Sequence, residues 1–457
     1  MNVSTESGPV PEVPAHREVA PGTPWILPII AGLMCVAIGV FGINTACRGA
    51  SIGLGIIFGC FLLRHLAFAV VSMRAAPNEM FGSDGIDTGY RPSVTIMVPC
   101  HNEEVVIAAS VEAVLALDYP TDKLQLIFIN DKSSDATGAI LDGVAAQHDH
   151  VQVIHRGPGS GGGKSGALNE ALDIATGEVT MVFDADHRPR ADALLRTVRH
   201  FADPLCAATQ GRCIIRNSTE SSLTRTVAVD YFSGYIVNEY GRQALFELPA
   251  YGGANCAVRT DVVRDLGGWN LETVTEDTDL TLRVVLNGMR VRYDMTAIDS
   301  EEGVPSYAKF WKQRYRWARG HQQVWRDYRG YVLRTPALTF TQRVETLMFL
   351  LVFHIPAFCA FGLGLLLLRA TGLVPWGRGL EIPAFASLLF LGPLVELAAG
   401  LLVSRAPRKA ASTLLMFFPA FFMFTIICAR SWLDGVLGRS YTWQKTSRSG
   451  HSLEGSS

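Results

Sequence analysis

The chain has 457 residues, enough for one large soluble domain together with a membrane part. Hydrophobic residues make up 49% of it, and its mean hydropathy of +0.22 is high for a soluble protein. A formal net charge of -2 argues against nucleic acid as a partner, because nucleic-acid-binding surfaces carry excess basic charge.

The apolar segments predict a membrane protein. Residues 1–24 are polar and Pro-rich, which predicts a disordered N-terminus. Five later segments are apolar over about 20 residues, the length of a bilayer-crossing helix. They predict two transmembrane helices within residues 25–71, with Arg64 snorkelling at the end of the second, and about three within residues 344–430. Five such lengths in two clusters disfavour the alternative of buried helices in a globular core. The segments are residues 25–47, 49–71, 346–368, 382–404 and 410–429.

Basic residues predict the orientation of these helices, because lysine and arginine concentrate in cytoplasmic loops. Residues 74–334 are too long and polar for anything but a soluble domain, and the short loop 405–409 is basic. We therefore expect a multi-pass plasma-membrane protein whose soluble domain is cytoplasmic. Three spans after this domain would place the tail, residues 431–457, outside the cell. Four basic residues at the end of the last span and in the tail conflict with this placement. They are Arg430, Arg439, Lys445 and Arg448.

The soluble block reads as an α/β domain over residues 92–304. Short apolar runs typical of buried parallel strands alternate with helical stretches, which favours a mostly parallel sheet. Ligands bind such sheets at the carboxyl ends of the strands, where Asp131 and Asp184 follow the second and fourth runs. The predicted strands are residues 94–99, 124–130, 151–155 and 179–183.

A glycine-rich stretch at residues 157–166 resembles a P-loop at first sight. The Walker pattern needs Gly six residues before Lys164, and this chain has Pro158 there. We therefore predict a flexible turn that presents Lys164 to a phosphate rather than an NTPase loop.

Two acidic motifs are candidates for metal binding and for general base catalysis. Asp184 and Asp186 suit a hard divalent cation that neutralises a departing diphosphate, although such a pair can also cap a helix. Glu276 and Asp277 begin an amphipathic stretch, where an acidic residue can be a simple cap. The functional alternative is a general base that takes a proton from an attacking hydroxyl.

Residues 305–335 interleave basic and aromatic side chains, which predicts amphipathic helices at the membrane interface. This does not exclude a second role for Gln313, Arg316 and Trp317. An arginine can pair with a diphosphate, and an indole face suits a sugar ring.

In this order the motifs resemble the processive, inverting family 2 glycosyltransferases, which include cellulose, hyaluronan and poly-N-acetylglucosamine synthases. The resemblance covers roughly residues 92–330 plus the tail. It rests on "FDADHRP", "YGGANCAVR", "GGWNLETVTEDTDLTLRVVLNGM", "WKQRYRWARGHQQVWRD" and "TWQKTSRSG", which look most like the cellulose synthase branch.

The resemblance implies a nucleotide-sugar-binding GT-A domain inserted between transmembrane helices. It also implies residue roles. Asp131 and Lys164 would hold uridine diphosphate, and Asp184 and Asp186 the diphosphate with Mg²⁺ or Mn²⁺. Asp277 would be the base, with Glu276 beside it. Gln313, Arg316 and Trp317 would bind diphosphate and acceptor, Tyr251, Gly252 and Gly253 would line the acceptor site, and residues from Trp443 to Thr446 would gate the nucleotide site.

One position departs from the family pattern, because Lys132 follows Asp131 where the family usually has Gly. Lys132 could alter the nucleotide pocket or simply face solvent. The chain also has no room after its tail for a cyclic-dinucleotide receptor domain, so that type of activation is not expected.

The sequence therefore predicts a hexosyltransferase that polymerises a β-linked glycan from a nucleotide sugar and passes it across the bilayer. UDP-glucose is the first candidate donor, and UDP-N-acetylglucosamine and GDP-mannose stay open. The growing glycan would be the acceptor, with accessory export subunits as further candidate partners. The alternative is a non-processive transferase that moves one sugar to a lipid or short acceptor. A third reading, a transporter or inactive scaffold, leaves the acidic residues unexplained.

Overall fold

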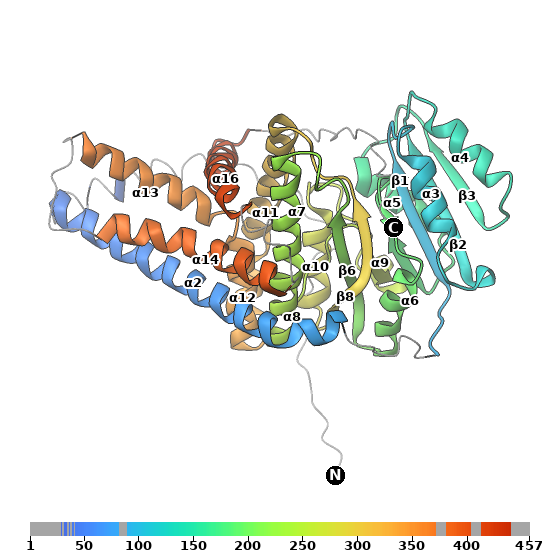
Figure 1. The fold of residues 1–457 in the computed structure, drawn as a ribbon, viewed down its shortest axis with the longest axis horizontal. Helices are drawn as coiled ribbons and strands as arrows, with labels where there is room; N and C mark the ends of the chain where they lie inside the picture. The colour runs from blue at the N-terminus through green and yellow to red at the C-terminus, as the bar shows by residue number, and fades with distance from the viewer. Residues whose placement is uncertain are drawn as a thin grey trace, which may run out of the picture.

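The structure is a computed structural model. It describes residues 29–81 apart from seven positions between 30 and 41, and residues 89–371, 381–403 and 413–439. Figure 1 shows strands β1 to β3 at one end of the molecule and helices α2, α13 and α14 extending to the other, with α7 and α11 between them.

One sheet of eight strands organises the soluble domain, in the order β3-β2-β1-β4-β7-β6-β8-β5. The four strands predicted from sequence are confirmed, and they pair in parallel at one end of the sheet. The other four add mostly antiparallel pairs, except that β6 and β8 are parallel. The strands are β1 (Val94–Cys100), β2 (Leu124–Asp131), β3 (Val151–Arg156), β4 (Val179–Val182), β5 (Arg188–Pro189), β6 (Cys206–Ile215), β7 (Cys256–Arg259) and β8 (Arg290–Glu301).

Helices cover both faces of this sheet, because alternate strand residues point to opposite sides. Ile96 packs in one core with helices α3 (Ile107–Leu115), α4 (Thr137–Ala145) and α6 (Ala193–Val198). Met97 packs in a second core. That core contains α5 (Gly163–Ile174), α9 (Thr260–Asp265), α10 (Glu276–Leu286) and α11 (Tyr307–Arg334).

A helical layer lies beyond α10 and α11 (Figure 1). Its short segments α7 (Ser222–Ser233), a π-helical turn (Gly234–Glu239) and α8 (Tyr240–Phe246) lead from the sheet to longer apolar helices. The longer helices are α2 (Ile43–Phe81), α12 (Phe340–Leu351), α13 (Ile355–Ala370), α14 (Glu381–Val403) and α16 (Thr413–Val436).

Fewer candidate membrane spans are found than the five expected. Within the described residues, two helical stretches are long and apolar enough to cross a bilayer, Ile52–Met80 and Phe417–Val436. A third candidate is the pair α12 and α13, which is bent by 60°. Leu391–Val403 is a shorter apolar helix, and about half of the predicted first span, residues 25–47, lies outside the described residues.

Arg64 does not snorkel as expected. It is 6% exposed and forms an ion pair of 2.7 Å with Glu345 of α12. Its Nη2 also donates to Asn238 Oδ1 at 3.3 Å. A buried arginine needs such partners, so this contact ties α2 to the helices that follow the soluble domain.

Candidate active site

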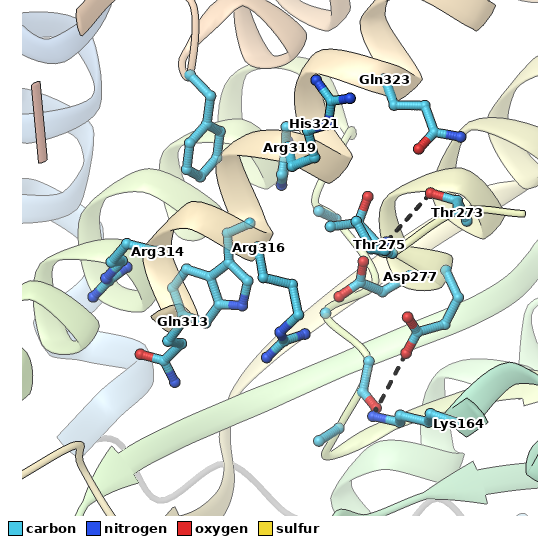
Figure 2. A pocket seen from close by; sticks show the side chains of 18 of the residues that line it. Lys164, Thr273, Thr275, Asp277, Gln313, Arg314, Arg316, Arg319, His321 and Gln323 are labelled. Carbon is cyan, nitrogen blue, oxygen red and sulfur yellow. Dashed lines mark hydrogen bonds and ion pairs between the residues drawn. The ribbon is translucent and has the colours of Figure 1, made fainter. Parts of the chain in front are cut away.

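A cavity of about 1480 Å³, here called the main cavity, opens at the carboxyl ends of β1, β2 and β4. Its walls include Asp131, Lys164, Asp184, Asp277 and Arg316, which are far apart in the sequence. Figure 2 shows Arg316 extending from α11 toward the space that Asp277 and Lys164 border. Polar groups of several predicted motifs therefore meet in one place, as the strand-end rule requires.

Lys164 links the acidic motifs. Its Nζ donates to Asp184 Oδ1 at 2.6 Å and to the Gly253 carbonyl at 2.8 Å, and lies 3.6 Å from Glu276 Oε1. Burial disfavours the charged amine, but Asp184 and Glu276 outweigh burial and raise the pKa of Lys164. The lysine therefore stays cationic, as a phosphate-binding group must.

Asp277 has the properties of a base that works near neutral pH. Burial and the neighbouring Glu276 raise its pKa to about 6, while Lys164 and Arg316 act against this rise. Asp277 Oδ1 accepts hydrogen bonds from Thr278 N at 2.6 Å and Thr278 Oγ1 at 3.2 Å. Oδ1 is therefore held by its neighbour, which leaves Oδ2 as the oxygen better placed to take a substrate proton.

Asp184 and Asp186 lie directly after β4 and both line the main cavity. The Asp184 side chain is 36% exposed, whereas Asp186 is 4% exposed and accepts from Glu302 N at 3.3 Å. The sequence did not predict His187 as part of the site. Its Nε2 lies 4.0 Å from Asp184 Oδ2.

His187 belongs to a buried cluster with Cys213 and Asp299, whose possible ligand atoms lie within 4.8 Å of one another. Its Nδ1 is hydrogen-bonded to Asp299. Burial disfavours the imidazolium, but Asp299 outweighs burial and raises the pKa of His187 well above its usual value. We interpret the cluster as an ion pair between His187 and Asp299 that supports Asp184. In the sequence, the only sign of this role is that His187 directly follows Asp186.

Asp131 is 9% exposed and accepts from Arg156 Nη1 at 2.7 Å. Arg156 is a second missed residue, and it pairs with Asp131 across β2 and β3. Lys132 does not simply face solvent. Its Nζ donates to the Ser160 carbonyl at 2.8 Å and lies 3.3 Å from Asp131 Oδ1. Its φ of +58° is a left-handed conformation, which explains why glycine suits this position.

Gln313, Arg316 and Trp317 lie on α11 and line the main cavity. Gln313 is 5% exposed. The Trp317 ring packs against the Arg314 guanidinium, whose carbon lies 4.4 Å from the ring centre. This part of α11 can approach the acidic motif because of Gly320, where a Cβ atom would lie 2.3 Å from Thr275 Cγ2.

His321, one helical position beyond Gly320, was also missed. Its Nε2 lies 3.3 Å from Thr278 Oγ1, the hydroxyl that also contacts Asp277. Its ring packs on Phe353, with 4.4 Å between ring centres. Burial, and then Arg242, lower the pKa of His321 to about 3, so this histidine is neutral at ordinary pH.

One predicted residue of the acceptor site does not reach the cavity wall, and the predicted gate cannot be compared with the structure. Gly252 and Gly253 line the cavity, but Tyr251 is 1% exposed and packs in the core beneath them. The predicted gate, with Trp443 and Thr446, lies outside the described residues. The chain just before that gate is described, and Arg439 borders the main cavity. The tail therefore begins beside the soluble domain.

Apolar side chains also line the main cavity. They are Phe349, Leu351, Val352, Phe353 and Phe358, from α12, α13 and the turn between them. One cavity thus joins a charged pocket at the sheet to a surface provided by apolar helices.

Sequence comparison finds proteins that are similar to this chain. The protein named "Probable glycosyltransferase YdaM" of Bacillus subtilis is 31% identical over 337 residues, 73% of this chain and 79% of the relative. The "Beta-monoglucosyldiacylglycerol synthase" of Synechocystis is 35% identical, over 61% of this chain and 58% of the relative. The "Poly-beta-1,6-N-acetyl-D-glucosamine synthase" of Staphylococcus aureus is 29% identical, over 51% and 56%. The chain thus spans little more than half the length of these last two relatives.

The fold is similar to a mannosyltransferase, PcManGT of Pyrobaculum calidifontis, solved with GDP-Man and Mn²⁺. The TM-score is 0.53 at 19% identity, covering 85% of this chain and 100% of that one. This likeness supports the predicted GT-A-like α/β fold. Residues 92–320 match the family described as "Glycosyltransferase like family 2". The chain belongs to this family and is a glycosyltransferase.

Proposed function

We propose that the protein transfers one sugar from a nucleotide sugar to the hydroxyl of a membrane lipid, with inversion at the anomeric carbon. UDP-glucose is the donor we favour. The monoglucosyldiacylglycerol synthase among the relatives supports both a glucosyl donor and a lipid acceptor. This proposal adopts the single-transfer alternative over the polymerase that the sequence first favoured.

The amphiphilic main cavity carries this proposal. Its charged side chains suit a nucleoside diphosphate, because Lys164 and Arg316 are cations beside a carboxylate-lined strand end. Its wall also contains Phe349, Phe353 and Phe358, which suits a substrate with an apolar part. A lipid alcohol has a hydroxyl and an apolar body in one molecule, and so matches both kinds of wall.

The mechanism follows from these groups. Asp277 takes the proton of the acceptor hydroxyl, and the oxygen attacks the anomeric carbon as the bond to the diphosphate breaks. One displacement converts an α-linked donor into a β-linked product. Lys164 and Arg316 bind the departing diphosphate.

The donor set at Asp184 and Asp186 fits Mg²⁺ or Mn²⁺. Both side chains offer oxygen atoms to the cavity, and Asp184 is exposed enough to share an ion with phosphate oxygens and water. Asp184 and Asp186 would hold the cation, which supplies charge neutralisation for the diphosphate.

Polymer synthesis stays as a second candidate, because Gln313, Arg316 and Trp317 lie together on the wall of the cavity. The poly-N-acetylglucosamine synthase among the relatives supports it as well. Translocation of a glycan through the apolar helices is part of this second candidate.

Product size separates the two candidates. Membranes containing the protein are incubated with Mg²⁺ or Mn²⁺, radiolabelled UDP-glucose, UDP-N-acetylglucosamine or GDP-mannose, and added diacylglycerol. We expect label in a single-sugar lipid that is extracted into organic solvent and cleaved by a β-glycosidase. High-molecular-weight product without labelled lipid would overturn the proposal in favour of the polymerase.

A further inference from the structure

A second cavity of about 290 Å³, here called the helix cavity, lies among α2, α7, α14 and α16. Most of its wall is carbon. Phe58 and Phe61 come from α2, and Phe417 and Phe421 from α16, and these rings form one apolar cluster with Leu397 of α14. Such a volume is at the small end for ligand pockets, which are roughly 300–1,000 Å³.

The helix cavity adjoins the main cavity. Six residues line both, so the two spaces share a wall. They are Asp230, Gly234, Asn238, Arg314, Val352 and Phe353. The side chains of this wall therefore contact both spaces, the one that Asp277 borders and the apolar one.

Arg314 makes the shared wall polar. It is 8% exposed, and Nη2 is paired with Asp230. Its Nε is buried and has no hydrogen-bond partner among the described residues. A guanidinium donates hydrogen bonds and accepts none, so its free N–H suits an accepting oxygen such as an ester carbonyl.

We propose that the helix cavity binds the acyl chain of the lipid acceptor, a diacylglycerol-type alcohol, with Arg314 at its ester group. The proposal rests on the proposed function and names the acceptor class. The acyl chain is the occupant because the rings of α2 and α16 offer apolar contact. Arg314 lines both cavities, which places the proposed ester site on the wall that they share.

A chain-length series tests the pocket. Ala420 of α16 lines the helix cavity, so Ala420→Phe fills it. Ile426 is on the same helix and 58% exposed, so Ile426→Phe is the matched control. Transfer from UDP-glucose is measured with dihexanoylglycerol and with dioleoylglycerol. We expect Ala420→Phe to raise KM for the long-chain acceptor about tenfold, as for loss of roughly two buried methylene groups, and to leave the short-chain acceptor unchanged.

Equal effects of Ala420→Phe on both acceptors, or an effect equal to that of Ile426→Phe, would overturn the proposal. A second measurement does not depend on turnover. A diacylglycerol with a diazirine near the end of one acyl chain is photocrosslinked to the wild-type protein, and labelled peptides are identified. Labels within α2 and α16 at Phe58 or Phe421, competed by dioleoylglycerol, support the pocket even if the sugar product proves to be a polymer. Labels confined to the exposed side of these helices reject it.

Discussion

Gly253 lies directly against the carboxylate of Asp277. Its φ is +80°, and a Cβ atom built there would lie 2.9 Å from Asp277 Oδ2. The Gly253 carbonyl meanwhile accepts from Lys164. The glycine therefore brings Asp277, the proposed base, and Lys164, the proposed phosphate ligand, to one backbone position with no side chain between them.

Gly253→Ala is expected to abolish transfer while the protein still folds. A left-handed alanine costs about 1–2 kcal/mol, and the added methyl group must push the Asp277 carboxylate away. The measurements are kcat and the melting temperature. Gly288→Ala is the control, since Gly288 also has a φ of +77° but no atom within 4 Å of its Cβ position. It should lose similar stability and keep its activity. Equal inactivation of both variants would show that backbone strain alone is responsible.

The pKa of Asp277 predicts the pH dependence of the reaction. A base with a pKa of about 6 is protonated and inactive below that pH, so kcat/KM should rise through about pH 6 and then level off. Asp277→Asn should lower kcat about 10²–10⁴-fold. Wild-type kcat in this variant, measured by release of labelled diphosphate, would reject Asp277 as the base.

The raised pKa of Asp277 also predicts how the stability of the protein depends on pH. Because the folded-state pKa of Asp277 is raised, the carboxyl binds its proton more tightly in the folded than in the unfolded chain. Stability is therefore lost as pH rises from the unfolded value of about 4 through 6. Asp277→Asn avoids this loss, so its melting temperature at pH 8 should equal or exceed that of the wild type. A lower value would mean that the carboxylate has a structural role.

Lys164→Met should raise KM for the nucleotide sugar and shift the pH profile upward. The lysine lowers the pKa of Asp277, so its removal moves the lower limb of the profile to higher pH. Loss of a charged hydrogen bond to phosphate should raise KM by about tenfold or more. Lys123→Met is the control, because Lys123 bonds the Arg91 carbonyl at an exposed position. An unchanged pH profile in Lys164→Met would show that Lys164 does not influence the pKa of Asp277.

The strand-end aspartates could be predicted because two simple rules agree. Buried parallel strands are continuous apolar runs, so β2 and β4 were visible in the sequence. The residues that follow them, Asp131 and Asp184, must then lie at the same edge of the sheet. The cavity confirms their position.

Other features needed the folded chain. Arg156, His187 and His321 each have a site partner 25 to 112 positions away, Asp131, Asp299 and Thr278, and the sequence does not show that these residues meet. Tyr251 is next to two cavity glycines but faces the core. The apolar run that starts in α12 is interrupted at residues 352–354, and a hydropathy average over residues 346–368 cannot detect that bend.

Gly320→Ala tests whether close packing of α11 on the acidic motif sets the active geometry. The new Cβ would lie 2.3 Å from Thr275 Cγ2 and 2.5 Å from Oγ1, so α11 and its Arg316 must move away from Asp277. We expect kcat to fall and, because Arg316 also binds the diphosphate in the proposed mechanism, KM for the donor to rise. Gly330→Ala on the same helix meets only the end of Arg334, at 3.3 Å, and should be neutral or stabilising by up to about 1 kcal/mol.

The decisive measurement is the double variant Gly320→Ala with Thr275→Ala. Removing Cγ2 and Oγ1 of Thr275 removes the two nearest clashes, so part of the lost kcat should return if steric separation is the cause. The two effects must then be less than additive. Additive losses would mean that Gly320 acts through the helix backbone and not through Thr275. The distance between α11 and Asp277 would then not depend on the contact of Gly320 with Thr275.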